Sequence, residues 1–93
     1  MEKIYLVFDE YTYNGIYEGM QVIPCATKEI AIRVVKEKLE WYLKESYLAT
    51  IDKDDLNDYD DSWEITEDYV DIYYSAKDTH LSLSIVESII KTE

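Results

Sequence analysis

The sequence predicts an α+β fold, in which one antiparallel sheet of four to five strands carries a single long helix packed on one face, in the order β-β-α-β-β-β. Apolar and polar residues alternate in several short runs, as expected of antiparallel strands that bury one face. One stretch between these runs repeats its apolar residues with the period of a helix. The 93 residues have the size of one domain, so we expect residues 1–93 to fold as a unit.

The first strand and a hairpin turn are expected near the start of the chain. Residues 3–8 are an apolar run rich in β-branched and aromatic side chains, which is typical of a buried central strand. Asn14 and Gly15 then stand between alternating aromatic residues, a pattern that predicts a type I′ turn. A turn at Glu18 and Gly19 is the alternative, and it leaves the register of the hairpin open.

The returning strand is expected over residues 20–26. Pro24 cannot donate a hydrogen bond to a neighbouring strand, so it favours an edge position or the end of a strand. Cys25, the single cysteine, is expected to be a small core residue at that strand end.

One long helix is expected over residues 28–47, with Thr27 as its N-cap. At about 100° per residue, six apolar side chains share one arc that should face the sheet, namely Ala31, Ile32, Val35, Leu39, Tyr42 and Leu43. A second arc holds Ile30, Val34 and Trp41. Either the linker or the C-terminal tail covers this second arc, or it is an apolar interface for a homodimer or a partner protein.

The second half of the chain supplies the remaining strands. Residues 47–62 have no clear period and are expected to form a linker. Residues 63–66, 70–74 and 81–85 alternate, and each run predicts a half-buried antiparallel strand. The tail, residues 86–91, suits either a continuation of the last strand through a bulge or a helical turn.

Four stretches of the chain together resemble a group of short bacterial and phage proteins with the same β-β-α-β-β-β pattern. These stretches are KIYLVFDEYTYNGIYEG, a Thr-Lys-Glu helix start, WEITEDYVDIYY and HLSLSIVESII. The resemblance covers most of the chain, and its motifs are strand patterns and turns. It implies the fold outline and an origin on a phage or another mobile element, and it transfers no activity and no site residue.

The charge of the chain is high and uneven. Acids outnumber bases by 21 to 9, which gives a net charge of -12. The segment 52–71 holds one base, Lys53, and ten acids: Asp52, Asp54, Asp55, Asp58, Asp60, Asp61, Glu64, Glu67, Asp68 and Asp71. Phosphates of nucleic acids and anionic lipids repel such a chain, so we expect neither direct nucleic-acid binding nor membrane binding.

The acidic segment predicts a binding surface for a basic protein. Apolar residues interleave the acids and could order the segment, and a compact ridge could approach the phosphate spacing of about 3.4 Å along one DNA strand. The predicted contact residues are Asp54, Asp55, Asp58, Tyr59, Asp60, Asp61, Trp63, Glu64, Glu67 and Asp68. The expected function is a nucleic-acid mimic that occupies the basic groove of a nucleic-acid-binding protein such as a nuclease, as anti-CRISPR or anti-restriction inhibitors do. The alternative is a small structural or homodimerising domain whose charge only confers solubility.

Enzymatic and metal chemistry find little support in the residues. His80 is the single histidine, and nothing in the sequence brings it to Cys25, so no catalytic residue is assigned. One cysteine and one histidine cannot supply an ordinary zinc set, and calcium-loop registers that start at Asp52 or Asp58 place apolar residues at ligand positions. We therefore expect no enzyme, no cofactor and no metal site.

The expected location is the cytoplasm of a bacterial cell or of a phage-infected host cell. A single cysteine favours a reducing compartment, because it cannot form an intramolecular disulfide. Residues 4–8 form the only apolar run near the start, and they are too few for the core of a signal peptide.

Overall fold

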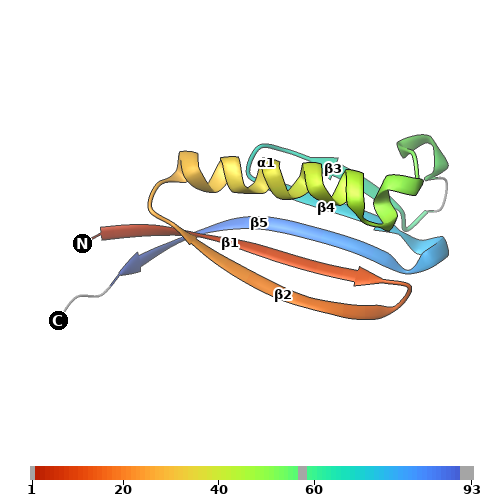
Figure 1. Ribbon diagram of the computed structural model, residues 1–93, viewed down its shortest axis with the longest axis horizontal. Helices are drawn as coiled ribbons and strands as arrows, with labels where there is room; N and C mark the ends of the chain where they lie inside the picture. The colour runs from red at the N-terminus through yellow and green to blue at the C-terminus, as the bar shows by residue number, and fades with distance from the viewer. Residues whose placement is uncertain (1, 57–58, 91–93) are drawn as a thin grey trace.

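The computed structural model describes residues 2–56 and 59–90, which form one antiparallel sheet of five strands and one α-helix. The α+β class is therefore confirmed, and the elements follow the predicted order (Figure 1). In chain order they are β1 (Glu2–Tyr13), β2 (Ile16–Cys25), α1 (Lys28–Glu45), the 3₁₀ turns η1 (Tyr47–Thr50) and η2 (Lys53–Asp55), β3 (Ser62–Ile65), β4 (Tyr69–Tyr74), the 3₁₀ turn η3 (Ser75–Lys77) and β5 (Thr79–Ile90).

The strands lie in the order β2-β1-β5-β4-β3, and every neighbouring pair is antiparallel. The last strand therefore lies beside the first, and their pairing runs from Glu2 opposite Ile90 to Thr12 opposite His80. Of the two alternatives for the tail, the strand is confirmed up to Ile90, and it continues without the expected bulge. Lys91 lies outside the described residues. Figure 1 shows β1 and β5 side by side along most of the molecule.

The hairpin between β1 and β2 turns at Asn14 and Gly15, as predicted. Both residues have positive φ angles, 52° and 78°, which is the conformation that a type I′ turn requires. The alternative turn at Glu18 and Gly19 is instead a β-bulge, because Tyr11 pairs with Gly19 while the next residue of β1 pairs with Tyr17. The hairpin is thus longer than the predicted strand runs.

The positions of Pro24 and Cys25 follow from the sheet order. β2 is an edge strand, so Pro24 removes no hydrogen bond from the interior of the sheet. Cys25 ends the strand and is buried, as predicted for a small core residue.

The helix α1 begins after Thr27, whose side chain accepts a hydrogen bond of 3.2 Å from the backbone nitrogen of Ile30. It ends at Glu45, two residues before the predicted end, because Ser46 turns the chain. The Ser46 hydroxyl donates to the Tyr42 carbonyl at 2.6 Å and accepts from the Leu48 nitrogen at 3.1 Å. One serine therefore closes the helix and starts η1.

The core contains residues of α1, of η1 and of four strands. Within residues 2–56 and 59–90, nine apolar residues are buried, namely Val7, Cys25, Ala31, Val35, Leu48, Val70, Ile72, Leu81 and Leu83. Three others of the predicted helix arc, Leu39, Tyr42 and Leu43, pack against them and are partly buried. The segment expected to be a linker contributes Leu48 to this core, so it is more ordered than its sequence suggested.

Candidate functional site

The first acids of the segment 52–71 stabilise η2. The Asp52 carboxylate accepts from the backbone nitrogen of Asp54 at 3.3 Å, and the Asp55 carboxylate accepts from the backbone nitrogen of Asp52 at 2.7 Å. This reciprocal capping box holds a turn of three residues whose carboxylates remain exposed to solvent. The acids therefore have fixed backbone positions and keep their charge at the surface.

The next acids connect this end of the molecule to η3. The half-buried Asp61 carboxylate accepts from the backbone nitrogen of Ser75 at 2.8 Å and from its hydroxyl at 2.7 Å. Asp60 and Tyr59 are exposed, and the Tyr59 side chain is 98% accessible. Asp58 lies outside the described residues.

The strand β3 divides the predicted contact residues between two sides. Successive side chains of a strand point to opposite faces, so Trp63 and Glu64 diverge. Trp63 is half-buried and packs against the core, whereas Glu64 is exposed and accepts a hydrogen bond from the Tyr69 hydroxyl. Trp63 thus contributes to the core, and Tyr59 is the aromatic residue that this segment exposes fully.

Glu67 and Asp68 lie in the turn between β3 and β4, at the far end of β3 from Asp61. The Thr66 hydroxyl donates to Asp68 at 3.1 Å, and both acids of the turn are exposed. β3 spans about 13 Å at roughly 3.3 Å per residue, so acids stand at both of its ends, and the exposed Glu64 lies on the strand between them. Figure 1 shows η2 beyond the C-terminal end of α1 and the β3–β4 turn alongside the helix.

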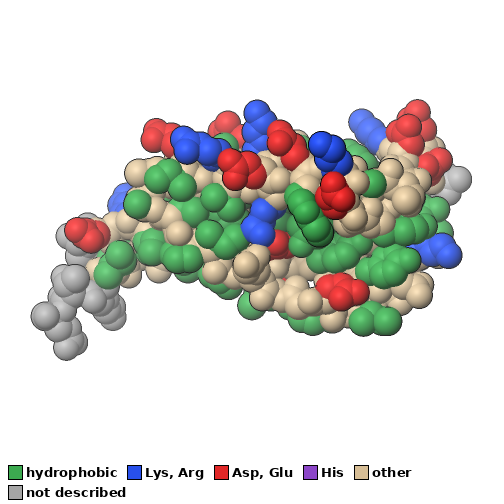
Figure 2. Space-filling model, viewed as in Figure 1, with side chains coloured by type: hydrophobic (Ala, Val, Ile, Leu, Met, Phe, Trp, Pro, Cys, Tyr) green, Lys and Arg blue, Asp and Glu red, His purple; other side chains and the backbone are tan. Residues whose placement is uncertain are grey.

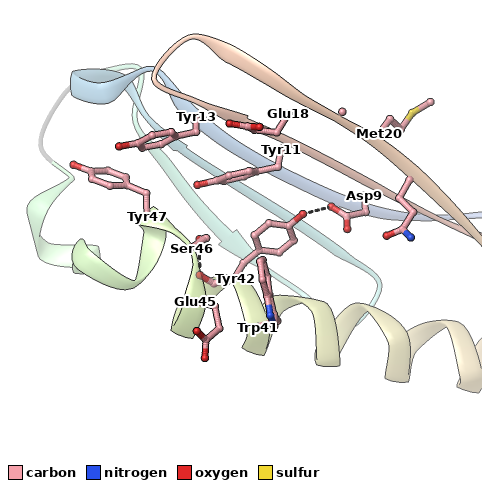
Figure 3. A pocket seen from close by; sticks show the side chains of 12 residues that line it. Asp9, Tyr11, Tyr13, Glu18, Met20, Trp41, Tyr42, Glu45, Ser46 and Tyr47 are labelled. Atoms are coloured by element: carbon pink, nitrogen blue, oxygen red, sulfur yellow. Dashed lines mark hydrogen bonds between the residues drawn. The ribbon is translucent and has the colours of Figure 1, made fainter.

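A second candidate site is a cleft between the C-terminal half of α1, η1 and the β1–β2 hairpin (Figure 3). We call it the tyrosine cleft. Its volume is about 740 Å³, and it is lined by Asp9, Tyr11, Tyr13, Glu18, Gly19, Met20, Gln21, Trp41, Tyr42, Glu45, Ser46 and Tyr47. Figure 2 shows hydrophobic side chains gathered between the helix and β2 at this end of the molecule.

Aromatic rings from three elements form the walls of the tyrosine cleft. The Tyr11 and Tyr42 ring centroids are 5.0 Å apart, and those of Tyr13 and Tyr47 are 5.1 Å apart. Trp41 meets Tyr42 edge to face at 5.2 Å and remains 56% exposed. Contacts of this kind stabilise ring pairs by about 0.5–1.5 kcal/mol each, so the walls are held in place before any ligand arrives.

A buried carboxylate, that of Asp9, links the helix to the sheet in the cleft (Figure 3). The Tyr42 hydroxyl donates to it at 2.7 Å, and the Lys38 ammonium lies 2.9 Å from its other oxygen. Lys38 also donates to the Gln21 side chain at 2.8 Å, so the contacts tie α1 to both β1 and β2. Both oxygens of the buried Asp9 carboxylate are therefore satisfied.

Burial and the neighbouring carboxylate change the acid–base behaviour of the tyrosines. Burial, and next the hydrogen bond to Asp9, raise the pKa of the Tyr42 hydroxyl far above its ordinary value. Burial also raises the pKa of Tyr11. Both hydroxyls therefore stay protonated at neutral pH, and Tyr42 remains a hydrogen-bond donor.

The charge inside the tyrosine cleft is negative. No Lys or Arg is among the described residues that line it, while Asp9, Glu18 and Glu45 are. Lys38 neutralises Asp9, and within residues 2–56 and 59–90 neither Glu18 nor Glu45 forms an ion pair. In Figure 3, Glu18 lies beside Tyr11 and Tyr13, whereas Glu45 points away from these rings.

Sequence reasoning missed this cleft except for Trp41, which it placed in an apolar arc with Ile30 and Val34. All three lie on α1, and their surroundings differ. Val34 is half-buried against the core, Ile30 is 38% exposed near the helix start, and Trp41 borders the cleft. The signal that could have found the cleft is the abundance of tyrosine, ten residues in 93, together with the pair Tyr11 and Tyr13 on one strand.

Two further features were searched for in the described part of the chain. It holds no group of three or more His, Cys, Asp or Glu residues that could bind a metal ion. None of its helices combines the length and the apolar character needed to cross a bilayer. Comparison with protein families, curated proteins and solved structures finds no match to this chain.

Proposed function

We propose that the protein is a non-enzymatic binding module that recognises a basic surface on another protein. The observation that carries this proposal is the segment 52–71, where ten acids accompany one base and where hydrogen bonds fix the turns that carry the acids. By contrast, Figure 2 shows acidic and basic side chains interspersed along α1. The acidic segment is therefore the surface that supports selective attraction of cations.

Long-range electrostatics support this function. A net charge of -12 attracts a basic protein over a distance of about 8–10 Å at ordinary ionic strength and accelerates the encounter. In the complex, arginine side chains of the partner would donate charge-assisted hydrogen bonds to exposed carboxylates such as Asp54 and Glu67. The exposed Tyr59 ring would add a rigid apolar contact at the same end as Asp54.

The partner class that we propose is a nucleic-acid-binding protein, such as a nuclease, whose basic groove the acidic surface occupies. The spread of the exposed acids from η2 along β3 to the β3–β4 turn favours contact at separate cationic sites of the partner. It does not support imitation of one continuous row of phosphates. The protein would then compete with a nucleic acid through charge and position rather than through a full copy of its backbone.

Capture from bacterial lysate with two charge-matched variants tests this proposal. One variant neutralises five acids of the segment, Asp54→Asn, Asp55→Asn, Asp60→Asn, Glu67→Gln and Asp68→Asn. The other neutralises five exposed acids elsewhere, Glu2→Gln, Glu10→Gln, Glu29→Gln, Glu37→Gln and Glu40→Gln. Quantitative mass spectrometry should show that basic nucleic-acid-binding proteins are lost from the first variant and retained by the second, and that capture weakens at high salt. Equal capture by both variants would contradict the proposed surface.

A second candidate function is homodimerisation, and the pattern of helix contacts favours it. Tyr42 and Lys38 bond to Asp9, Lys38 bonds to Gln21, and the Tyr42 ring meets Tyr11. Asp9 pairs with Gln21 across the strands, and Tyr11 lies two residues further along β1. Since alternate residues share a face, we infer that α1 covers one face of the sheet and leaves the other open.

The open face carries apolar side chains. Met20, Val22 and Val86 are 51%, 41% and 46% exposed, and cross-strand pairing places them on the same side as Leu6 and Phe8. Such a patch is typical of an interaction surface, and a second copy of the chain would cover it. Because two chains of charge -12 repel each other, this dimer should form more readily at high salt.

Analytical ultracentrifugation at low and high salt tests the dimer. Val22→Lys places a charge on the open face and should leave a monomer under conditions in which the wild-type chain dimerises. Ile30→Lys places the same charge on the helix surface and should leave the dimer intact. A dimer that Ile30→Lys abolishes and Val22→Lys does not would assign the interface to the helix instead.

A further inference from the structure

We propose that the tyrosine cleft binds an organic cation, an ammonium or guanidinium group carried on an apolar stem. The cleft volume of about 740 Å³ is within the range of ligand sites in proteins, roughly 300–1,000 Å³. The β1–β2 hairpin meets the junction of α1 and η1 there, so the cavity belongs to the folded scaffold and not to a single loop.

The walls of the cleft favour a cation with an apolar body. Tyr11 and Tyr13 stand on β1, and Tyr42 and Tyr47 stand on the helix end and η1 (Figure 3). Aromatic faces attract ammonium and guanidinium groups, and several rings around one space form the arrangement that recognises alkylated cations. Trp41, which is 56% exposed, extends the aromatic lining at the border of the cleft.

The charges of the cleft favour a cationic ligand over an anionic one. The Asp9 carboxylate already has the Lys38 ammonium at 2.9 Å and the Tyr42 hydroxyl at 2.7 Å, so it needs no further partner. Glu18 lies beside Tyr11 and has no ion-pair partner among the residues that the structure describes. A ligand cation would pair with Glu18 while its stem contacts the rings, whereas an anion would be repelled by Glu18 and would find no Lys or Arg among the described lining residues.

The ligand cation has two sources, a free alkylamine or alkylguanidine and a Lys or Arg side chain of a protein. The site for a free cation stands independently of the proposed function. The second source rests on that function, because it makes the cleft a pocket for one cationic side chain of the basic partner. In that case the cleft adds a specific contact to the general attraction of the segment 52–71.

NMR titration with butylguanidinium tests the site, and 1-pentanol serves as an uncharged probe of similar size. Butylguanidinium should shift the backbone amides of Gly19, Ser46 and Tyr47, which line the cleft. Pentanol should shift them far less, because it lacks the charge that Glu18 and the rings recognise. Absence of shifts with butylguanidinium, or equal affinity for both probes, would overturn the proposal.

Two variants of equal charge separate a specific site from general attraction. Glu18→Gln should weaken butylguanidinium binding by about tenfold, while Glu10→Gln, an exposed acid outside the cleft lining, should change it by less than about twofold. Equal weakening by both would reduce the effect to net charge and overturn the site. Melting temperatures of both variants serve to verify that each is folded.

A peptide pair distinguishes the two sources. Acetyl-Gly-Arg-Gly-amide that binds more tightly than the same peptide with neutral citrulline supports a side chain as ligand. Binding of butylguanidinium alone supports a free cation and excludes the side chain. Failure of the cleft proposal and failure of the proposed function are distinguishable. The lysate capture experiment tests only the segment 52–71, and its variants leave Glu18 unchanged.

Discussion

The buried Asp9 carboxylate shows how one residue depends on partners far away in the sequence. Its hydrogen-bond donor Tyr42 is 33 residues away, and its ion-pair partner Lys38 lies on the same helix. A carboxylate that is 5% exposed would be costly without these partners, because burial removes its contacts with water. The position of α1 on the sheet is therefore coupled to the charge of one side chain.

Removal of the Tyr42 hydroxyl is expected to destabilise the protein. Tyr42→Phe keeps the ring contact with Tyr11 and leaves one oxygen of Asp9 without its donor, which should lower the free energy of unfolding by about 1–2 kcal/mol. Urea denaturation measures the change. Tyr17→Phe is the control, because Tyr17 is 58% exposed and should alter stability little. Equal effects of both variants would contradict the role of the Asp9 bond.

The same hydroxyl predicts a loss of stability in alkali. The pKa of Tyr42 is raised from its ordinary value of 10.0, chiefly by burial, and the unfolded chain regains the ordinary value. As the pH rises above about 10, the Tyr42 hydroxyl therefore loses its proton in the unfolded chain while it stays protonated in the folded one. The free energy of unfolding falls over this range, until the pH passes the pKa of the folded state. Below that pH the contribution is fully present.

Denaturation midpoints between about pH 9 and 11 measure this alkaline loss. The free energy of unfolding should decline with pH in the wild-type chain and decline less in Tyr42→Phe, which has no proton to release at that position. Tyr11 keeps its own raised pKa in both proteins, so the difference between them isolates Tyr42. Equal declines of the free energy of unfolding in the wild-type chain and in Tyr42→Phe would contradict the role of Tyr42 in the alkaline loss.

At the scale of elements, η1 anchors the C-terminal end of the helix to the core. Ser46 terminates α1 and starts η1, which places Leu48 among the core residues at 1% exposure. The same turn brings Tyr47 to Tyr13 across the tyrosine cleft. This short turn therefore supports both the core and the candidate site.

Leu48→Ala tests whether η1 anchors the helix end to the core. Truncation of a fully buried leucine should lower the free energy of unfolding by about 2–5 kcal/mol, through lost burial and the cavity that remains. Ala49→Ser, at the exposed neighbour, should cost far less. Guanidinium denaturation gives both values, and a small loss for Leu48→Ala would indicate that the segment is dispensable for the core.

At the scale of the whole molecule, the net charge of -12 opposes folding by self-repulsion. Salt screens this repulsion, so the melting temperature should rise between about 20 mM and about 500 mM sodium chloride. The variant with five neutralised acids in the segment 52–71 should respond less to salt. A lower melting temperature at high salt would show that specific ion pairs, such as Lys38 with Asp9, outweigh the repulsion.

The fold outline was predictable because its signals are local. Asn14 and Gly15 specify their turn by backbone conformation, and Thr27 caps the helix within three residues. Pro24 indicated an edge strand, since proline lacks the donor that an interior strand needs. The end of the helix was less accurate, because Ser46 stops it through bonds that periodicity does not reveal.

The sequence by itself determined the element types, the hairpin turn, the helix start and the excess of acid, each of which depends on residues near one another in the chain. Only the tertiary structure decided that β5 lies beside β1, that Trp63 packs inward while Glu64 stays exposed, and that acids stand at both ends of β3. It also decided where the tyrosines meet. These outcomes depend on strand register and on contacts between distant residues, which local propensity and composition do not specify.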